Sequence, residues 1–172
     1  TNCILVCDST IARYYANGVG GAAFSWVVNG GTVIADYGDS IDVFWTTVGL
    51  TGSVVLHGAF HHCIDSAKAC FKVIDKPNAL FATDSFYCLD ANIVFTDLSA
   101  GDPSSPIMYW HWDFGDGTAT SSTIPATIEH AYHDAGTYTV TLIVRNQCNC
   151  ADTFRKKIEI SKYTSPNIIC PS

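Results

Sequence analysis

The chain has 172 residues, of which 48% are hydrophobic and 15% are charged, so it has the apolar content for packed cores and is not a highly charged, disordered polypeptide. Its net charge is −7 with lysine and arginine scattered, which excludes the basic stripe that a nucleic-acid partner requires. No run of about 18 apolar residues occurs, so we expect no membrane insertion.

Short β-strands are predicted along the whole chain, and no long stretch has a helical period. The strands are rich in valine, isoleucine, threonine and aromatic residues, and their apolar residues alternate. Glycine-rich turns separate them, such as 29–31 and 115–117. The predicted strands are 41–45, 53–56, 71–74, 93–96, 128–132, 137–144 and 154–160.

The sequence repeats itself with a shift of about 86 residues. When Trp26 is aligned with Trp112, Gly31 falls on Gly117. Further along, the segment 41–45 falls on 128–132, and the Cys-Ile-Asp-Ser run at Cys63 falls on the Cys-Ala-Asp-Thr run at Cys150. Because several landmarks keep one register, the chain is predicted to hold two copies of one structural unit.

The beginnings of the units are marked by cysteines that follow apolar residues. Cys7, Cys88 and Cys170 hold this position, with steps of 81 and 82 residues. We therefore expect a first β-sandwich at 1–76, a second at 77–163, and a linker with the first strand of a following unit at 164–172. Seven or so short strands per unit favour an all-β architecture of two tandem immunoglobulin-like β-sandwiches, head to tail.

The second unit resembles a PKD domain, an immunoglobulin-like module. The resemblance is carried, in order, by 95–99 (Phe-Thr-Asp-Leu-Ser), 112–117 (Trp-Asp-Phe-Gly-Asp-Gly), 130–132 (His-Ala-Tyr) and 135–142 (Ala-Gly-Thr-Tyr-Thr-Val-Thr-Leu). The first unit looks like a divergent relative, since Asn29-Gly30 replaces the Gly-Asp turn.

The resemblance implies roles for several motif residues. Trp112, and Trp26 by alignment, are expected to be buried in the sandwich core. Asp113 and Asp116 flank a glycine turn, and Tyr138 fits a tyrosine corner. The resemblance also implies a large bacterial surface or secreted protein, in which such domains serve in tandem as spacers or adhesive stalks.

Eight cysteines at spread-out positions favour disulfides over zinc, and hence an oxidising, extracellular or cell-surface location. Equivalent positions in the two units lead us to expect one bridge in each unit. Cys3 and Cys70 are a further pair, and Cys148 is expected to reach Cys170 across the unit boundary. The expected bridges are Cys7–Cys63, Cys88–Cys150, Cys3–Cys70 and Cys148–Cys170.

Other polar residues are interpreted as structural. Asp97, Asp113 and Asp116 are calcium candidates because they carry hard oxygen ligands, but a structural turn is favoured. Ser40 and Ser66 follow aspartates in an Asp-Ser-aliphatic pattern that some bacteria O-glycosylate, and ordinary strand-edge residues explain it equally well. No nucleophile elbow, zinc-protease or phosphate-loop motif occurs, so we expect no enzyme and no cofactor.

Two functions are weighed. The first is a structural subunit or repeat segment of an extracellular fibre or adhesin stalk, whose partners are other copies of itself or adjacent repeats. In that reading the assembly residues are Asn167, Ile168, Ile169 and Cys170, which need a partner because a lone apolar strand is an open edge. The alternative is an accessory module of a secreted hydrolase, which binds a surface glycan or a protein.

Overall fold

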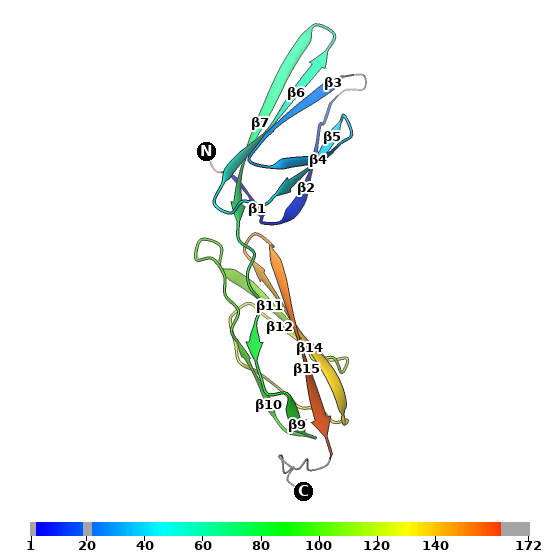
Figure 1. The fold of residues 1–172 in the computed structure, drawn as a ribbon, viewed down its shortest axis with the longest axis vertical. Helices are drawn as coiled ribbons and strands as arrows, with labels where there is room; N and C mark the ends of the chain where they lie inside the picture. Colours follow the sequence, from blue (N-terminus) through cyan, green and yellow to red (C-terminus); the bar gives the residue numbers. More distant parts are fainter. Residues whose placement is uncertain (1–2, 19–21, 163–172) are drawn as a thin grey trace. The chain divides into compact units, whose positions relative to one another are not determined.

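Every regular element of the chain is a β-strand in the computed structural model, which describes residues 3–18 and 22–162 (Figure 1). The chain divides into two compact units, Thr1–Asp75 and Lys76–Ser172, called unit 1 and unit 2 below. The predicted all-β, immunoglobulin-like fold class is confirmed. Among the described residues, none forms a helix of the length and apolarity needed to cross a bilayer.

Unit 1 consists of two sheets. One is four-stranded in the order β1-β7-β6-β3, and the other is three-stranded in the order β2-β5-β4. β6 and β7 form a long antiparallel hairpin, in which Phe60 pairs with Cys63 at the turn. The strands are β1 (Ile4–Cys7), β2 (Thr10–Tyr15), β3 (Ala23–Asn29), β4 (Thr32–Asp36), β5 (Ser40–Trp45), β6 (Thr51–Phe60) and β7 (Cys63–Ile74).

Unit 2 has a five-stranded sheet in the order β12-β11-β14-β15-β9 and a three-stranded sheet in the order β13-β10-β8. Its strands are β8 (Phe81–Ala82), β9 (Phe86–Cys88), β10 (Ile93–Asp97), β11 (Ile107–Asp113), β12 (Ala119–Ser122), β13 (Ile128–His130), β14 (Gly136–Asn146) and β15 (Ala151–Ser161). The order β9-β15-β14-β11 reproduces β1-β7-β6-β3 of unit 1, including the parallel pairing of the first strand with the last.

The register of the strands shows that the two units are structural repeats. In unit 1, Leu56 lies between Trp26 and Ala67 on the neighbouring strands. In unit 2, Leu142 lies in the same way between Trp112 and Phe154. On the facing sheets, Tyr14 pairs with Ile41 and Phe95 pairs with Ile128. Each residue of unit 1 in these rows therefore has a counterpart in unit 2.

The units differ in their edge strands. β4 pairs with β5, whereas its counterpart β12 pairs with β11 on the opposite sheet. Unit 2 also has β8, which adds to the outer side of β10. Among the described residues, β2 has no such neighbour on its outer side.

The two cores have different central residues. Trp112 is 1% exposed and packs with Phe81 and Phe95 in unit 2. The expectation that Trp26 is an equally buried counterpart is wrong, because Trp26 is only partly buried against its core. In unit 1 the fully buried tryptophan is Trp45, which corresponds to Tyr132 of unit 2.

The structure joins Cys3 to Cys70 in a disulfide. The expected Cys7–Cys63 bridge is wrong, because β1 runs parallel to β7 with Cys7 opposite Ile74 while Cys63 begins that strand. At about 3.3 Å per residue the two cysteines are roughly 35 Å apart, far beyond disulfide reach. Cys63 is instead a free, exposed thiol.

The other two expected bridges are also wrong. Cys88 lies opposite Ser161 at the end of β15, whereas Cys150 precedes the start of that strand, so roughly 35 Å again separates them. Both cysteines are disulfide-bonded, and a separation of this size excludes a bond between them. Cys148 is a free thiol, so it does not bridge to Cys170. Equivalent repeat position therefore does not identify disulfide partners in this fold, because the shared positions lie at opposite ends of one sheet.

Candidate functional site

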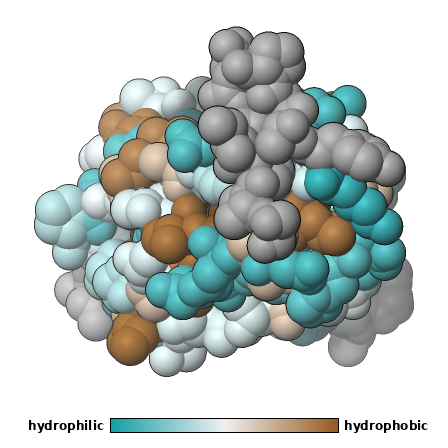
Figure 2. Space-filling view, turned by 90° about the horizontal axis from the view of Figure 1, so that it is seen from below, coloured by the Kyte–Doolittle hydropathy of each residue, from teal (hydrophilic) through white to brown (hydrophobic). Residues whose placement is uncertain are grey.

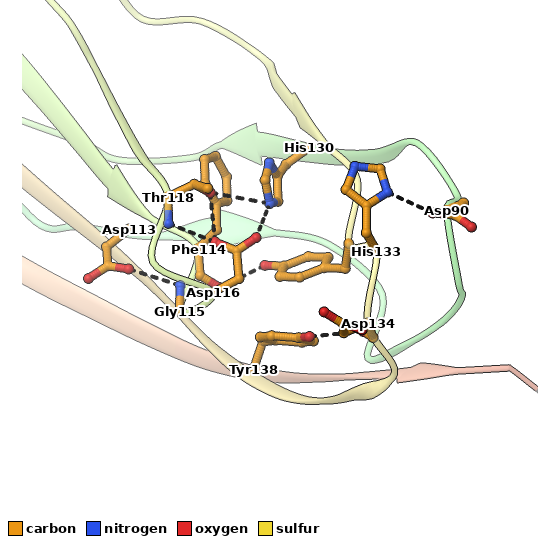
Figure 3. A network of polar contacts seen from close by, with 11 residues as sticks. Asp90, Asp113, Phe114, Gly115, Asp116, Thr118, His130, His133, Asp134 and Tyr138 are labelled. Carbon is orange, nitrogen blue, oxygen red and sulfur yellow. Dashed lines mark hydrogen bonds and ion pairs between the residues drawn. The ribbon is translucent and has the colours of Figure 1, made fainter.

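A network of polar side chains surrounds the turn that joins β11 to β12 in unit 2 (Figure 3). The Asp113 carboxylate accepts a hydrogen bond from the backbone N–H of Gly115 at 2.9 Å. The Asp116 carboxylate accepts two, from the backbone N–H and the hydroxyl of Thr118, at 2.9 and 2.6 Å. Gly115 has φ +80°, a conformation that glycine adopts without strain. Each aspartate thus stabilises its own half of the turn.

His130 of β13 ties the turn to the facing sheet. Its Nε2 lies 2.7 Å from the Asp116 carboxylate, and the two side chains are only 17% and 18% exposed. The imidazole stacks on the Phe114 ring, with 4.0 Å between ring centroids. Hydrogen bonds from Thr118 and His130 outweigh partial burial and lower the pKa of Asp116, so the carboxylate is ionised at neutral pH.

Two tyrosines complete the network. The buried Tyr132 donates its hydroxyl hydrogen bond to the carbonyl of Phe114 at 2.8 Å, and burial followed by the nearby Asp116 charge raises its pKa. Tyr138 donates to the carbonyl of Asp134, four residues upstream, at 2.8 Å. This geometry is that of a tyrosine corner. Figure 3 shows these groups directed at backbone atoms and at one another, an arrangement that fixes loops.

The calcium candidates do not gather into a coordination sphere. Asp97 accepts hydrogen bonds from the Trp110 indole at 2.7 Å and from the backbone N–H of Ser99 at 2.9 Å. Asp113 and Asp116 hold separate parts of the glycine turn. Within residues 3–18 and 22–162, no three His, Cys, Asp or Glu side chains are close enough together to hold a metal ion.

The outer face of the three-stranded sheet in unit 1 carries a second polar group. Arg13 of β2 makes two 2.6 Å hydrogen bonds to Asp42 of β5, and its guanidinium lies over the Tyr37 ring, 4.9 Å from the centroid. The Arg13 guanidinium lowers the pKa of the Asp42 carboxyl. The pair lies directly across two strands, where opposite charges stabilise a sheet.

An apolar cavity of about 230 Å³ opens between the sheets of unit 1. Tyr14 and Tyr15 of β2 line one side, and Trp26 of β3 lines another. The Tyr14 hydroxyl accepts a 3.1 Å hydrogen bond from the Trp45 indole, so it is held at the cavity wall. The remaining lining residues belong to the β6–β7 hairpin: Val54, Leu56, Ala67, Lys68 and Ala69.

The remaining candidate residues have different environments. Ser40 is only 7% exposed, which disfavours glycosylation, whereas Ser66 is exposed. The predicted assembly residues Asn167, Ile168, Ile169 and Cys170 lie outside the described residues. On the face drawn in Figure 2, apolar groups are separated by hydrophilic ones. Such isolated apolar residues are ordinary on a protein surface.

Sequence reasoning missed the Arg13–Asp42 pair and the cavity. The pair had one available signal, since Arg13 and Asp42 each occupy a polar position within an alternating strand. The cavity had none, because it depends on which segment covers the gap between the sheets.

A family model described as "PKD domain" matches residues 74–161. A "Microbial collagenase" of Vibrio alginolyticus is 32% identical over 85 residues, which are 49% of this chain and 10% of the collagenase. This chain thus matches only a tenth of that curated relative.

Three similar solved structures each match about half of this chain. The PKD1 domain of Vibrio anguillarum Epp is 22% identical over 51% of this chain and 96% of its own, with a TM-score of 0.44. The PKD1 domain of the Vibrio cholerae metalloprotease PrtV is 26% identical over 50% of this chain and 98% of its own, with a TM-score of 0.42. A structure from work on β-sandwich carbohydrate-binding modules is 35% identical over 54% of this chain and 37% of its own, with a TM-score of 0.48.

Proposed function

The chain belongs to the PKD domain family, and from this premise we propose that it is a non-catalytic, structural segment of an extracellular fibre or adhesive stalk, in which such units follow one another head to tail. The observation that carries the proposal is the register-matched repetition of one sandwich within a single chain. A structural element that is used in series needs a module that can be repeated.

The chemistry of the polar groups supports the same proposal. Asp113, Asp116 and Tyr138 hold turns, and Arg13 and Asp42 neutralise each other across a sheet. The Cys3–Cys70 bridge closes a long loop, as expected for a module that must stay folded in an oxidising environment. We therefore place the protein outside the cell.

The experiment is electron microscopy of material isolated from the native source, labelled with an antibody against this chain. The proposal expects thin filaments or stalks that carry label at regular intervals. Label found only on compact particles with hydrolase activity would reject the fibre and favour the second candidate.

The second candidate is an accessory module of a secreted hydrolase, which binds a glycan or a protein substrate. The similarity to part of a microbial collagenase favours it, since that match covers half of this chain. The two candidates are distinguished by the coding sequence on either side of this chain. Further units of about 80 residues favour the fibre, and an adjoining hydrolase domain favours the accessory module.

A further inference from the structure

The alternation of β11 places two aromatic rings on the outer face of the five-stranded sheet of unit 2. Trp110 and Trp112 of this strand are 5% and 1% exposed and belong to the core. Because successive side chains of a strand point to opposite faces, Tyr109 and His111 lie on the outer face, where each is half-buried. Neither ring belongs to the core cluster, so the packing of the sandwich does not account for them.

A single serine holds both rings in place. The Ser121 hydroxyl of β12 lies 3.0 Å from the Tyr109 hydroxyl and 2.9 Å from Nδ1 of His111. The two ring planes are within 3° of parallel, and their centroids are 6.4 Å apart. The rings therefore form one preorganised surface, which a ligand can contact without the cost of first ordering flexible side chains.

A surface cavity of about 410 Å³ opens beside Tyr109. Its lining consists of Tyr109, Ser121, Ser122, Thr123 and Ile124. The Ser122 hydroxyl donates to the carbonyl of Ile124 at 2.8 Å and accepts from its N–H at 3.1 Å, which fixes the turn that follows β12. The volume is in the range of small-ligand cavities, roughly 300–1,000 Å³.

The chemistry of this lining favours a neutral sugar. The Tyr109 ring and the Ile124 side chain, which is 66% exposed, are apolar, whereas the other lining residues contribute hydroxyl groups. None of the five lining side chains carries a charge, so the cavity does not select an ion. A pyranose has C–H groups on the faces of its ring and hydroxyl groups around its rim, so apolar surfaces beside hydroxyl groups match it.

Polar groups beside the rings remain available for a ligand. Within the described part of the chain, the Thr123 hydroxyl makes no hydrogen bond. Arg145 of β14 lies opposite Tyr109, with its guanidinium 5.8 Å from the ring centroid. Arg13 of unit 1 also lies over a tyrosine ring but is neutralised by Asp42, whereas Arg145 has no carboxylate partner among the described residues. The N–H donors of Arg145 are thus free to bind hydroxyl oxygens.

We propose that this cavity binds a neutral polysaccharide, with one pyranose ring against Tyr109 and Ile124 and hydroxyl groups of the sugar chain bonded to Thr123 and Arg145. An extended peptide is the competing occupant, because the outer edge of β12 has no strand partner among the described residues. That edge is only four residues long, and the cavity beside it offers hydroxyl groups, whereas strand addition relies on pockets for alternate side chains. The inference goes beyond the fibre proposed above and does not depend on it, since a single copy of unit 2 contains the whole cavity.

Isothermal titration calorimetry of the 172-residue chain with cellohexaose, chitohexaose and maltohexaose tests the site, with oligogalacturonate as the charged comparison and gelatin as the unfolded polypeptide. We expect at least one of the neutral hexasaccharides to bind. Tyr109→Ala is expected to weaken that binding about ten-fold or more, because the ring that packs on the sugar is lost, while Tyr109→Phe retains most of it. Ile124→Ala removes an apolar contact and is expected to weaken binding about three-fold or more. Tyr37→Ala, at a tyrosine of unit 1 that is 57% exposed and also lies beside an arginine, is the matched control and leaves the affinity unchanged.

Binding of none of the three neutral hexasaccharides overturns the proposal, as does binding that Tyr109→Ala and Ile124→Ala leave unchanged. Gelatin bound through Tyr109 without any saccharide binding would identify a peptide site instead, and preference for oligogalacturonate would contradict a neutral ligand. Thermal unfolding by circular dichroism checks the fold of each variant. Should Tyr109→Ala unfold unit 2, Ile124→Ala decides the matter, because its side chain is exposed and lies outside the core. None of these outcomes bears on head-to-tail assembly, which electron microscopy tests separately.

Discussion

Replacing Trp112 by alanine tests the proposed core of unit 2. The Trp112 side chain is 1% exposed and packs against Phe81, Phe95 and Leu142. A buried tryptophan removes about 150–250 Å² from water, which at roughly 25 cal/mol per Å² corresponds to about 4–6 kcal/mol. Allowing for partial collapse of the cavity, we expect Trp112→Ala to lower the free energy of unfolding by about 3–5 kcal/mol. A domain of this size is stable by only about 5–15 kcal/mol, so the loss is large.

The matched control is Trp26→Ala at the corresponding position of unit 1. Trp26 is only partly buried and faces an open cavity, so its loss is expected to cost roughly 2 kcal/mol. Both variants are measured by urea unfolding followed by far-UV circular dichroism, because removal of a tryptophan changes the fluorescence itself. Equal losses in the two variants, or a loss under about 1 kcal/mol for Trp112→Ala, would refute the difference in packing described for the two units.

Three further predictions concern the turn network and the disulfide. The pKa of Asp116 is lower in the folded state than in the unfolded state, so its contribution to stability is present above about pH 4 and is lost as the pH falls through the lower folded pKa. Asp116→Asn is therefore expected to reduce the pH dependence of the unfolding midpoint in acid. An unchanged pH dependence would contradict the role of this carboxylate. Gly115→Ala is expected to destabilise unit 2 more than Gly117→Ala in thermal unfolding. Both glycines have positive φ, which costs alanine about 1–2 kcal/mol, but of the two only Gly115 would bring an added Cβ close to a backbone atom, the Thr139 carbonyl oxygen at 2.7 Å. Equal effects of the two substitutions would disagree with the turn geometry. The double variant Cys3→Ala/Cys70→Ala is expected to lower the stability of unit 1 by about 4 kcal/mol, since the bridge spans 67 residues, and calorimetry that showed no change in the unit 1 transition would argue against the bridge.

Much of unit 2 could be predicted from local signals. The alternation along 137–144 and the glycine turn at 115–117 correspond to β14 and to the β11–β12 connection, because strand period and positive φ are properties of a few adjacent residues. The PKD resemblance is confirmed by the family match over 74–161. The placement of Tyr138 also followed from its motif, since a tyrosine corner bonds only four residues upstream.

Contacts between distant segments were not predictable in the same way. The sequence indicated a strand at 71–74, whereas β7 begins at Cys63, because its first half is exposed and has no apolar alternation to reveal it. This longer strand is the reason that Cys7 and Cys63 lie far apart. The cavity beside Trp26 was equally hidden, since its lining comes from β2, β3 and the β6–β7 hairpin, which are distant in the sequence.

Head-to-tail assembly is tested most directly by electron microscopy of the purified chain with and without residues 164–172, which hold the expected assembly residues Asn167 to Cys170. We predict that the longer chain forms end-to-end strings whose length increases with concentration. The truncated chain keeps every described strand and is expected to give single particles with unchanged circular dichroism. Identical strings from the truncated chain, or single particles from the longer chain at every concentration, would contradict head-to-tail assembly.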